Sequence, residues 1–163
     1  MKKHFLNLML ISFAFASIST TTPPKGFNYS SREGKFSVVF PAQYTVDAKE
    51  NTIKISATSN EQTYYASYTI HNVELTNRKE LAEISLNSFS DILKSPIIEQ
   101  SDWKTNKNTG LQATLNMQEK NIKIKYYVVL VGQIQYQMIV MAENALFDQK
   151  AADAFVKSFK LDK

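Results

Sequence analysis

The segment from Ile122 to Glu143 restricts the fold of this chain more than any other stretch of its sequence. It reads IKIKYYVVLVGQIQYQMIVMAE, with Gly132-Gln133 at its centre. This pair suits a two-residue type II′ turn, because glycine adopts the positive φ of the first central position without strain. The segment is therefore predicted to form a β-hairpin. In this register both faces are largely apolar: one carries Tyr127, Val129, Val131, Ile134, Tyr136 and Met138, and the other carries Ile124, Tyr126, Val128, Leu130, Ile139 and Met141.

A hairpin with two apolar faces cannot leave either face in water. We therefore expect it in the middle of an antiparallel sheet that is covered on both sides. Apolar and polar residues alternate, as is typical of strands, in the segments 34–44, 51–59 and 62–73. The segments 97–105 and 111–118, separated by turn residues, are also predicted as strands. These segments supply the strands that would surround the hairpin.

Two other segments have the period of a helix. Between Asn77 and Lys94 an apolar stripe consists of Leu81, Ile84, Ser88 and Ile92, widened by Ser85 and Phe89. Near the end of the chain the stripe consists of Ala152, Phe155, Val156 and Phe159. With one helix available for each face, the sequence predicts an α+β fold, namely an α/β/α sandwich with a central antiparallel sheet flanked by helices on both faces.

The amino-terminal residues have the features of a secretory signal peptide. Lys2 and Lys3 are positively charged, the run from Phe5 to Ala16 is mostly apolar, and Ala14-Phe15-Ala16 has the small-x-small pattern of a cleavage site. The apolar run is shorter than the roughly 20 residues that span a bilayer. We therefore expect cleavage, no transmembrane anchor afterwards, and export to the periplasm or the cell exterior.

Removal of this peptide should leave one domain. We expect a signal peptide over residues 1–19, a short Thr/Pro-rich leader over 20–26, and a single α/β domain over 27–163. The chain has no cysteine, so neither a disulfide nor a lipidated cysteine is available. Without Lys2 and Lys3 the formal charge falls from +4 to +2, and the remaining lysines are dispersed. Nucleic-acid binding usually requires clustered Arg and Lys, so we do not expect it.

The order of residues from Gly34 to Tyr44, Gly-x-Phe-Ser-Val-x-Phe-Pro-x-x-Tyr, resembles the PsbP-like family. Tyr-rich strands, a helix in mid-chain, a long apolar hairpin and a terminal helix ending FVKSFKL extend the resemblance over about residues 27–162. The family includes the extrinsic PsbP subunit of photosystem II, exported bacterial proteins and relatives that bind the Ran GTPase. The resemblance implies an α/β/α sandwich and a non-catalytic domain that docks on a partner. It implies no site residue, because no family motif for a metal or chloride transfers to this sequence.

The sequence contains no combination of residues that is typical of an enzyme. Once His4 leaves with the signal peptide, His71 is the remaining imidazole, and no Gly-x-Ser-x-Gly motif accompanies it. His71 and Glu74 are too few ligands for a zinc site, which takes three or four. The four glycines lie too far apart for a phosphate-binding loop. We expect no catalytic residue, no metal and no cofactor.

Four residues are candidates for binding. Trp103 lies among polar residues, and it is either an interface aromatic or a residue packed against a helix end. Gln135 and Gln137 interrupt the apolar face of Tyr126, as the solvated end of that face or as polar groups in a small pocket beneath a helix. His71 is expected near a loop at the surface.

Three functions follow from these observations. The first is a binding module that docks on a protein partner of the bacterial envelope, supported by the signal peptide and the family resemblance. The second is a carrier of a small apolar ligand between helix and sheet. The third, and least supported, is a hydrolase that uses His71.

Overall fold

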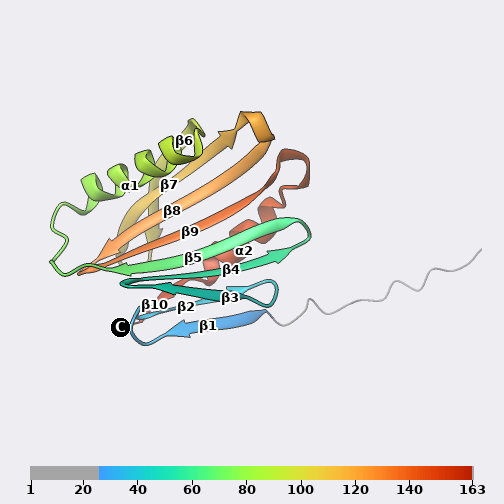
Figure 1. Ribbon diagram of the computed structural model, residues 1–163. Helices are drawn as coiled ribbons and strands as arrows, with labels where there is room; N and C mark the ends of the chain where they lie inside the picture. Colours follow the sequence, from blue (N-terminus) through green and yellow to red (C-terminus); the bar gives the residue numbers. More distant parts are fainter. Residues whose placement is uncertain (1–25, 163) are drawn as a thin grey trace, which may run out of the picture.

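The computed structural model describes residues 26–162 (Figure 1). The predicted signal peptide and the leader up to Lys25 lie outside these residues. The helices are α1 (Arg78–Leu93) and α2 (Gln149–Ser158), with short 3₁₀ turns at η1 (Gln118–Lys120) and η2 (Asn144–Leu146). The strands are β1 (Phe27–Ser31), β2 (Phe36–Phe40), β3 (Thr45–Lys49), β4 (Thr52–Ser59), β5 (Gln62–Ile70), β6 (Ile97–Thr105), β7 (Asn108–Met117), β8 (Ile122–Val131), β9 (Ile134–Glu143) and β10 (Lys160–Leu161). Neither helix in this part of the chain has the length and apolar character needed to cross a bilayer.

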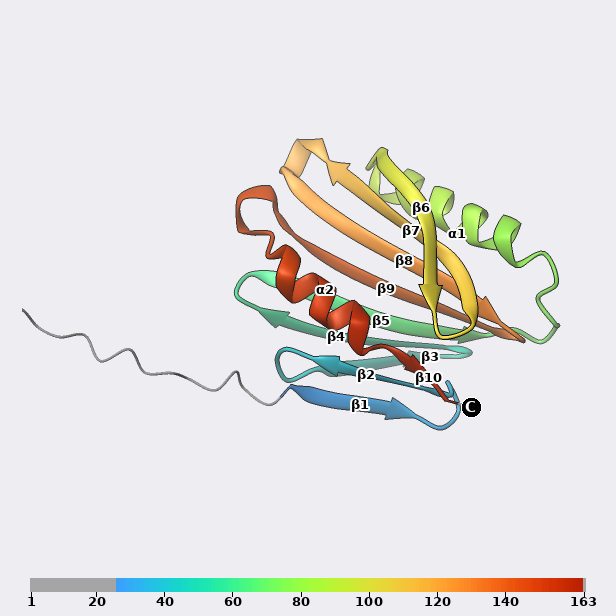
Figure 2. The same ribbon diagram turned by 180° about the vertical axis from the view of Figure 1, so that it is seen from behind.

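The strands form two antiparallel sheets. The larger sheet has seven strands in the order β3-β4-β5-β9-β8-β7-β6, and the smaller has three in the order β1-β2-β10. The two views in Figures 1 and 2 show the long strands of the larger sheet twisting across the molecule, with α1 and α2 on different sides of it.

The predicted β-hairpin is confirmed as β8 and β9. Val131 pairs with Ile134 and Tyr127 with Met138, and Gly132 has a φ of 59° at the turn. The two strands occupy the middle of the larger sheet. Successive residues of β8 point to opposite sides, so that Tyr126 joins the core beneath α1 and Tyr127 joins the core on the α2 side.

The helix α1 covers β7 and β8 with a face that differs from the predicted one. Its fully buried residues are Ala82 and Leu86, whereas Ile84 and Ile92 are 53% and 79% exposed. A shift of one residue rotates a helical face by about 100°. Here the stripe Ala82, Leu86, Phe89 and Leu93 packs on the sheet, and the prediction that Ile84 and Ile92 face the core is wrong.

On the opposite side, α2 shares the core with the three-stranded sheet. Ala152, Phe155 and Val156 of α2 are buried as predicted, and they pack with Phe36 and Phe40 of β2. A helix is about 10 Å wide and neighbouring strands lie about 4.8 Å apart, so one helix covers only about two strands. The β1-β2-β10 sheet covers part of the apolar face of the larger sheet that α2 leaves uncovered.

The α+β class and the central antiparallel sheet are confirmed. The predicted α/β/α sandwich is not confirmed in that form, because one of its outer layers contains strands as well as a helix. The segment 34–44 was expected to open the central sheet, and instead β2 lies in the smaller sheet. Phe36, Val38 and Phe40 are all fully buried, with the intervening residues more exposed, so β2 presents a single apolar face to this core.

Raising the pH above 10 should destabilise the protein. The pKa of Tyr126, Tyr127 and Tyr136 is raised to about 12 each, mainly because the phenols are buried. Below pH 10 these phenols are neutral in the folded and the unfolded chain, and their contribution to stability is fully present. Between pH 10 and 12 only the unfolded chain releases these protons, so the free energy of unfolding falls by up to about 1.4 kcal/mol per pH unit for each phenol. Urea unfolding at pH 9, 10 and 11 measures this slope.

The variant Tyr127→Phe is the matched control for this pH dependence. It removes one phenol whose pKa is raised by burial. The slope above pH 10 should therefore become shallower, by at most about one third, because burial also raises the pKa of Tyr29 and Tyr64. A tyrosinate absorbance step that precedes the loss of the folded circular-dichroism signal and is missing in Tyr127→Phe would contradict the prediction, because Tyr127 would then ionise in the folded chain.

Candidate functional site

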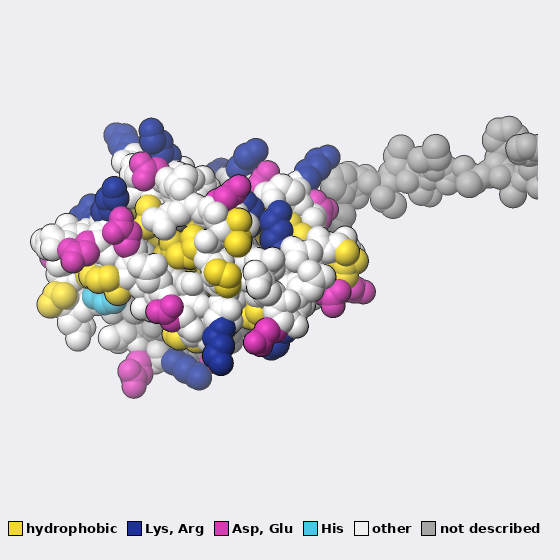
Figure 3. Space-filling model, turned by 90° about the horizontal axis from the view of Figure 1, so that it is seen from above, with side chains coloured by type: hydrophobic (Ala, Val, Ile, Leu, Met, Phe, Trp, Pro, Cys, Tyr) yellow, Lys and Arg dark blue, Asp and Glu magenta, His cyan; other side chains and the backbone are white. Residues whose placement is uncertain are grey.

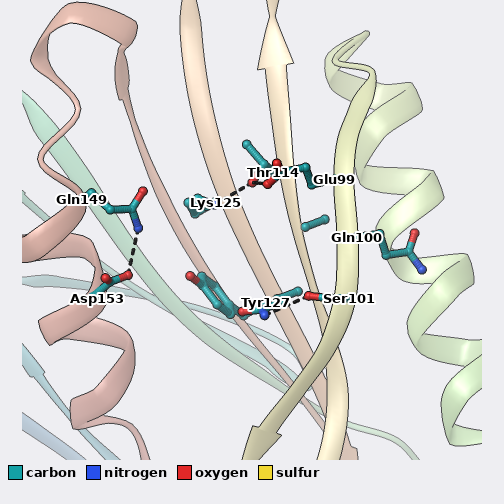
Figure 4. A pocket seen from close by; sticks show the side chains of 10 residues that line it. Glu99, Gln100, Ser101, Thr114, Lys125, Tyr127, Gln149 and Asp153 are labelled. Atoms are coloured by element: carbon teal, nitrogen blue, oxygen red, sulfur yellow. Dashed lines mark hydrogen bonds between the residues drawn. The ribbon is translucent and has the colours of Figure 1, made fainter.

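A polar cleft of about 180 Å³ lies between β6 and α2, with β7 and β8 as its floor (Figure 4). Antiparallel pairing aligns its residues in rows across the three strands. One row is Glu99, Thr114 and Lys125, and the next is Ser101, Gln112 and Tyr127. Figure 4 shows Gln149 and Asp153 of α2 on the other side of the floor from β6.

The two-residue period of the strands explains why these polar side chains gather on one face. In β7, Gln112 and Thr114 alternate with Leu111, Ala113 and Leu115, which are buried beneath α1. The α2 side of β7 and β8 is apolar only where α2 and the smaller sheet cover it. The uncovered part of the same face is therefore free to be polar.

Hydrogen bonds orient most of the polar groups in the cleft. Lys125 Nζ donates to Thr114 Oγ1 at 2.6 Å, and the Thr114 hydroxyl donates to Glu99 Oε2 at 3.5 Å. Across the cleft, Gln149 Nε2 donates to Asp153 Oδ1 at 2.8 Å. Among residues 26–162 the ion pair found within 4.0 Å is Arg78–Glu74, so neither carboxylate of the cleft is neutralised by direct pairing with Lys125.

Tyr127 forms the buried part of the cleft floor. Burial raises the pKa of its phenol to about 12, and the negative charge of Asp153 raises it further in the same direction. The phenol therefore stays neutral at physiological pH. The cleft offers an ammonium, two carboxylates, hydroxyls and amides, which are groups for binding a polar molecule. Within residues 26–162 no three His, Cys, Asp or Glu side chains are placed to hold a metal ion together.

Trp103 lies in the core, with 8% of its surface exposed. Its ring centroid is 5.3 Å from that of Tyr127 and 5.7 Å from that of Phe159. Its cross-strand partner is Gly110, where a Cβ atom would overlap the backbone carbonyl of Val128. The indole packs over a position that must be glycine, so the structure gives Trp103 a packing role, while a role in binding stays a prediction.

Gln135 and Gln137 lie half-buried beneath α1, where they hydrogen-bond to Ser85 of that helix. Their Nε2 atoms donate to Ser85 Oγ at 3.0 Å and 2.8 Å, and Gln137 Nε2 also donates to the Tyr126 hydroxyl at 2.9 Å. The hydroxyls of Ser85 and Tyr126 are 2.8 Å apart. These bonds join α1 to the sheet, so both amide groups have protein partners of their own.

His71 follows β5 and lies far from the cleft. Its backbone N–H donates to the carbonyl of Gln133 at 2.8 Å, which places it beside the β8–β9 turn. Its Nε2 is buried without a hydrogen-bond partner among the described residues. The structure therefore does not bring the four predicted binding residues together in one site.

Sequence reasoning missed the cleft, because its residues come from four elements that are distant in sequence. One signal was available: Lys123 and Lys125 interrupt the apolar face of the hairpin that carries Tyr127 and Val129. Such an interruption marks the place where the covering layer stops.

The sequence matches no protein-family model and no curated protein sequence. The structure is similar to the solution structure of cyanobacterial PsbP from Synechocystis, with a TM-score of 0.61 and 7% identity over 90% of this chain and 98% of that one. The chain has a PsbP-like fold. A crystal structure from Bacteroides thetaiotaomicron has a TM-score of 0.47 and 10% identity over 85% of this chain, which spans about half, 49%, of that protein. The family resemblance seen in the sequence is thus confirmed at the level of the fold.

The outer surface of α1 carries large apolar side chains. Ile84 and Ile92 are exposed there, and Ile98, at the start of β6, is 56% exposed. Glu80, Asp91 and Lys94 add exposed charges on and beside the helix. Figure 3, seen from above Figure 1, shows hydrophobic side chains among scattered charges of both signs.

An apolar groove of about 900 Å³ runs along α2, from Asp148 before its first residue to Ser158 at its end. Val39 and Leu146 are the large exposed apolar side chains in its lining, and Pro41 and Ala154 extend it. Gln62 supports one wall, because its side chain accepts from the backbone N–H of Asp148 at 2.8 Å and donates to the Asp148 carbonyl. This groove is larger and more apolar in its lining than the cleft.

Replacing Trp103 with alanine should lower the free energy of unfolding by about 3–5 kcal/mol, the usual effect of truncating a buried Trp or Phe. The reason is the loss of packing against Tyr127 and Phe159. Chemical denaturation of the wild-type protein and the variant measures it. Phe27→Ala, which truncates an exposed aromatic, is the control and should cost less than about 1 kcal/mol. Unchanged stability of Trp103→Ala would contradict the packing role and favour a contact role.

Proposed function

We propose that this chain is an exported, non-catalytic domain that docks on a protein partner of the bacterial cell envelope through the outer surface of α1. The observation that carries this proposal is the exposure of Ile84 and Ile92 at positions where the sequence pattern predicts burial. Local patterns that disagree with the tertiary structure are expected at functional sites, because elsewhere selection for folding removes them.

The physical basis is the hydrophobic effect. Burying an isoleucine side chain contributes about 1.5–3 kcal/mol relative to leaving it in water. Ile84, Ile92 and Ile98 therefore provide a driving force for association. Protein interfaces commonly have an apolar centre and a polar rim, and the exposed charges of Glu80, Asp91 and Lys94 suit such a rim. A partner with its own apolar patch would complement this surface.

Other support comes from the sequence. The signal-peptide pattern favours an envelope location, and the shortage of catalytic motifs around His71 favours binding over chemistry. The PsbP-like fold is consistent with an envelope location and with a binding function.

Crosslinking in the producing cells, followed by purification of the tagged protein and mass spectrometry, tests the docking proposal. The double variant Ile84→Gln/Ile92→Gln should recover at least tenfold less of the partner than the wild type, because the apolar contact is lost. Its free energy of unfolding should change by less than about 0.5 kcal/mol, since both side chains are exposed.

Val46→Thr is the control, because it alters an exposed apolar residue on β3, away from α1, and should leave partner recovery unchanged. Equal recovery of the same partner by the double variant and the wild type would rule out α1 as the docking surface. Failure to recover any protein in near-equal amount would rule out stable docking.

A second candidate function is a carrier of a small apolar ligand, favoured by the groove along α2. Its volume of about 900 Å³ lies within the range of known ligand pockets. The site differs from the predicted pocket at Gln135 and Gln137, whose amide groups are bonded to Ser85 beneath α1.

Thermal unfolding with decanoate as the probe tests the carrier function. At ten times the dissociation constant, binding adds about 1.4 kcal/mol and should raise the Tm by roughly 3–5 °C. Leu146→Lys, which places a charge in the groove lining, should abolish this increase, and Val46→Lys should retain it. A Tm increase that is equal in all three proteins would contradict binding in the groove.

A further inference from the structure

We propose that the polar cleft between β6 and α2 is a binding site for a free amino acid in its zwitterionic form. This inference goes beyond the proposed docking function and is independent of it. The cleft opens on the α2 side of the larger sheet, whereas the exposed isoleucines of α1 lie over the other side.

The size of the cleft restricts the ligand. A volume of about 180 Å³ corresponds to roughly six water molecules at about 30 Å³ each. Pockets for drug-sized ligands begin at about 300 Å³. A molecule with the size of an amino acid therefore fills the cleft, whereas most of a lipid or a nucleotide would lie outside it.

The cleft carries charges of both signs that are not paired with each other, as a molecule with one charge of each sign requires. Lys125 Nζ lies over the floor and uses one of its three protons on Thr114 at 2.6 Å, so two protons can serve a ligand carboxylate. Asp153 uses Oδ1 for the bond from Gln149, which leaves Oδ2 for a ligand ammonium. Lys125 pairs directly with neither Asp153 nor Glu99 within 4.0 Å, so each group keeps its capacity for an opposite charge.

Neighbouring contacts hold these groups in place. Lys123 Nζ lies 4.6 Å from the centre of the Phe147 ring and donates to Gln149 Oε1 at 3.5 Å. The side-chain amide of Gln149 therefore has its oxygen toward Lys123 and its nitrogen toward Asp153. On the opposite wall, the Thr114 hydroxyl donates to Glu99, which places a second carboxylate near the same space. Charge-assisted hydrogen bonds from pre-positioned groups are stronger than neutral ones.

The floor supplies a rigid apolar surface for the rest of the ligand. Tyr127 is held edge-on by Trp103, with ring centroids 5.3 Å apart. Because its hydroxyl is neutral, the phenol can donate or accept a hydrogen bond beside Asp153. An amino acid can thus place its ammonium at Asp153, its carboxylate at Lys125 and its side chain against the Tyr127 ring.

Two-dimensional NMR titration of the ¹⁵N-labelled protein, purified after export, tests this site with three probes. L-alanine carries both charges, L-alaninamide carries only the positive charge, and N-acetyl-L-alanine carries only the negative charge. L-alanine should shift the amide signals of Lys125, Tyr127 and Asp153 with a dissociation constant below about 1 mM. Each singly charged analogue should bind at least tenfold more weakly.

Variants assign the two charges. Asp153→Asn and Lys125→Met should each weaken L-alanine binding at least tenfold, because each removes one partner of the zwitterion. Asp91→Asn on α1 and Lys54→Met on β4 are matched controls at exposed positions away from the cleft, and binding should be unchanged. Circular dichroism checks that all four variants remain folded.

Three results would overturn the inference. The first is the absence of shifts with 20 mM L-alanine. The second is equal binding of L-alanine and L-alaninamide, which would show a site for a simple cation. The third is unchanged L-alanine binding by Asp153→Asn and Lys125→Met in folded protein.

Discussion

The pairing of β8 with β9 is the constraint on which the rest of the structure depends. The turn at Gly132, with a φ of 59°, sets a register in which both faces of the hairpin are mostly apolar. A slip of one residue would exchange the two faces and separate Tyr126 from Ser85 of α1 and Tyr127 from Trp103. Because strands alternate strictly, this hairpin divides the side chains into two separate cores, one beneath α1 and one beneath α2 and the smaller sheet.

Both candidate surfaces follow from incomplete coverage of that sheet. On the α2 side, the helix and the three-stranded sheet leave β6, β7 and part of β8 uncovered, and the exposed positions there are polar. On the other side, α1 approaches β7 and β8 through the small side chain of Ala82, which turns Ile84 and Ile92 outward. A polar cleft and an apolar helix surface therefore arise on opposite sides of one sheet, where they can act separately.

Much of the fold could be predicted from local patterns. The hairpin, both helices and the antiparallel sheet were predicted from residues that are close in sequence, and the structure confirms them. The rotation of α1 could not be predicted in this way, because two stripes have helical spacing. The predicted one has the spacing i, i+3, i+7, i+11 and the observed one i, i+4, i+7, i+11, namely Leu81, Ile84, Ser88 and Ile92 against Ala82, Leu86, Phe89 and Leu93. The choice between them depends on the shape of the sheet beneath, where a small residue permits closer approach. For Trp103 the sequence left an interface role and packing against a helix end open, because its sequence neighbours are polar and a strand places neighbours on opposite faces.

The sequence by itself determined the fold class and the two-sided hairpin, because the alternation of side chains in a strand and the positive φ at Gly132 are local properties of the chain. Only the tertiary structure decided where β2 lies, which face of α1 meets the sheet, and that Glu99, Lys125 and Asp153 share one cleft. Those outcomes depend on strand order and register between residues far apart in the chain. Such long-range pairing is selected by the total burial of apolar surface, a sum over the whole molecule that no local pattern contains.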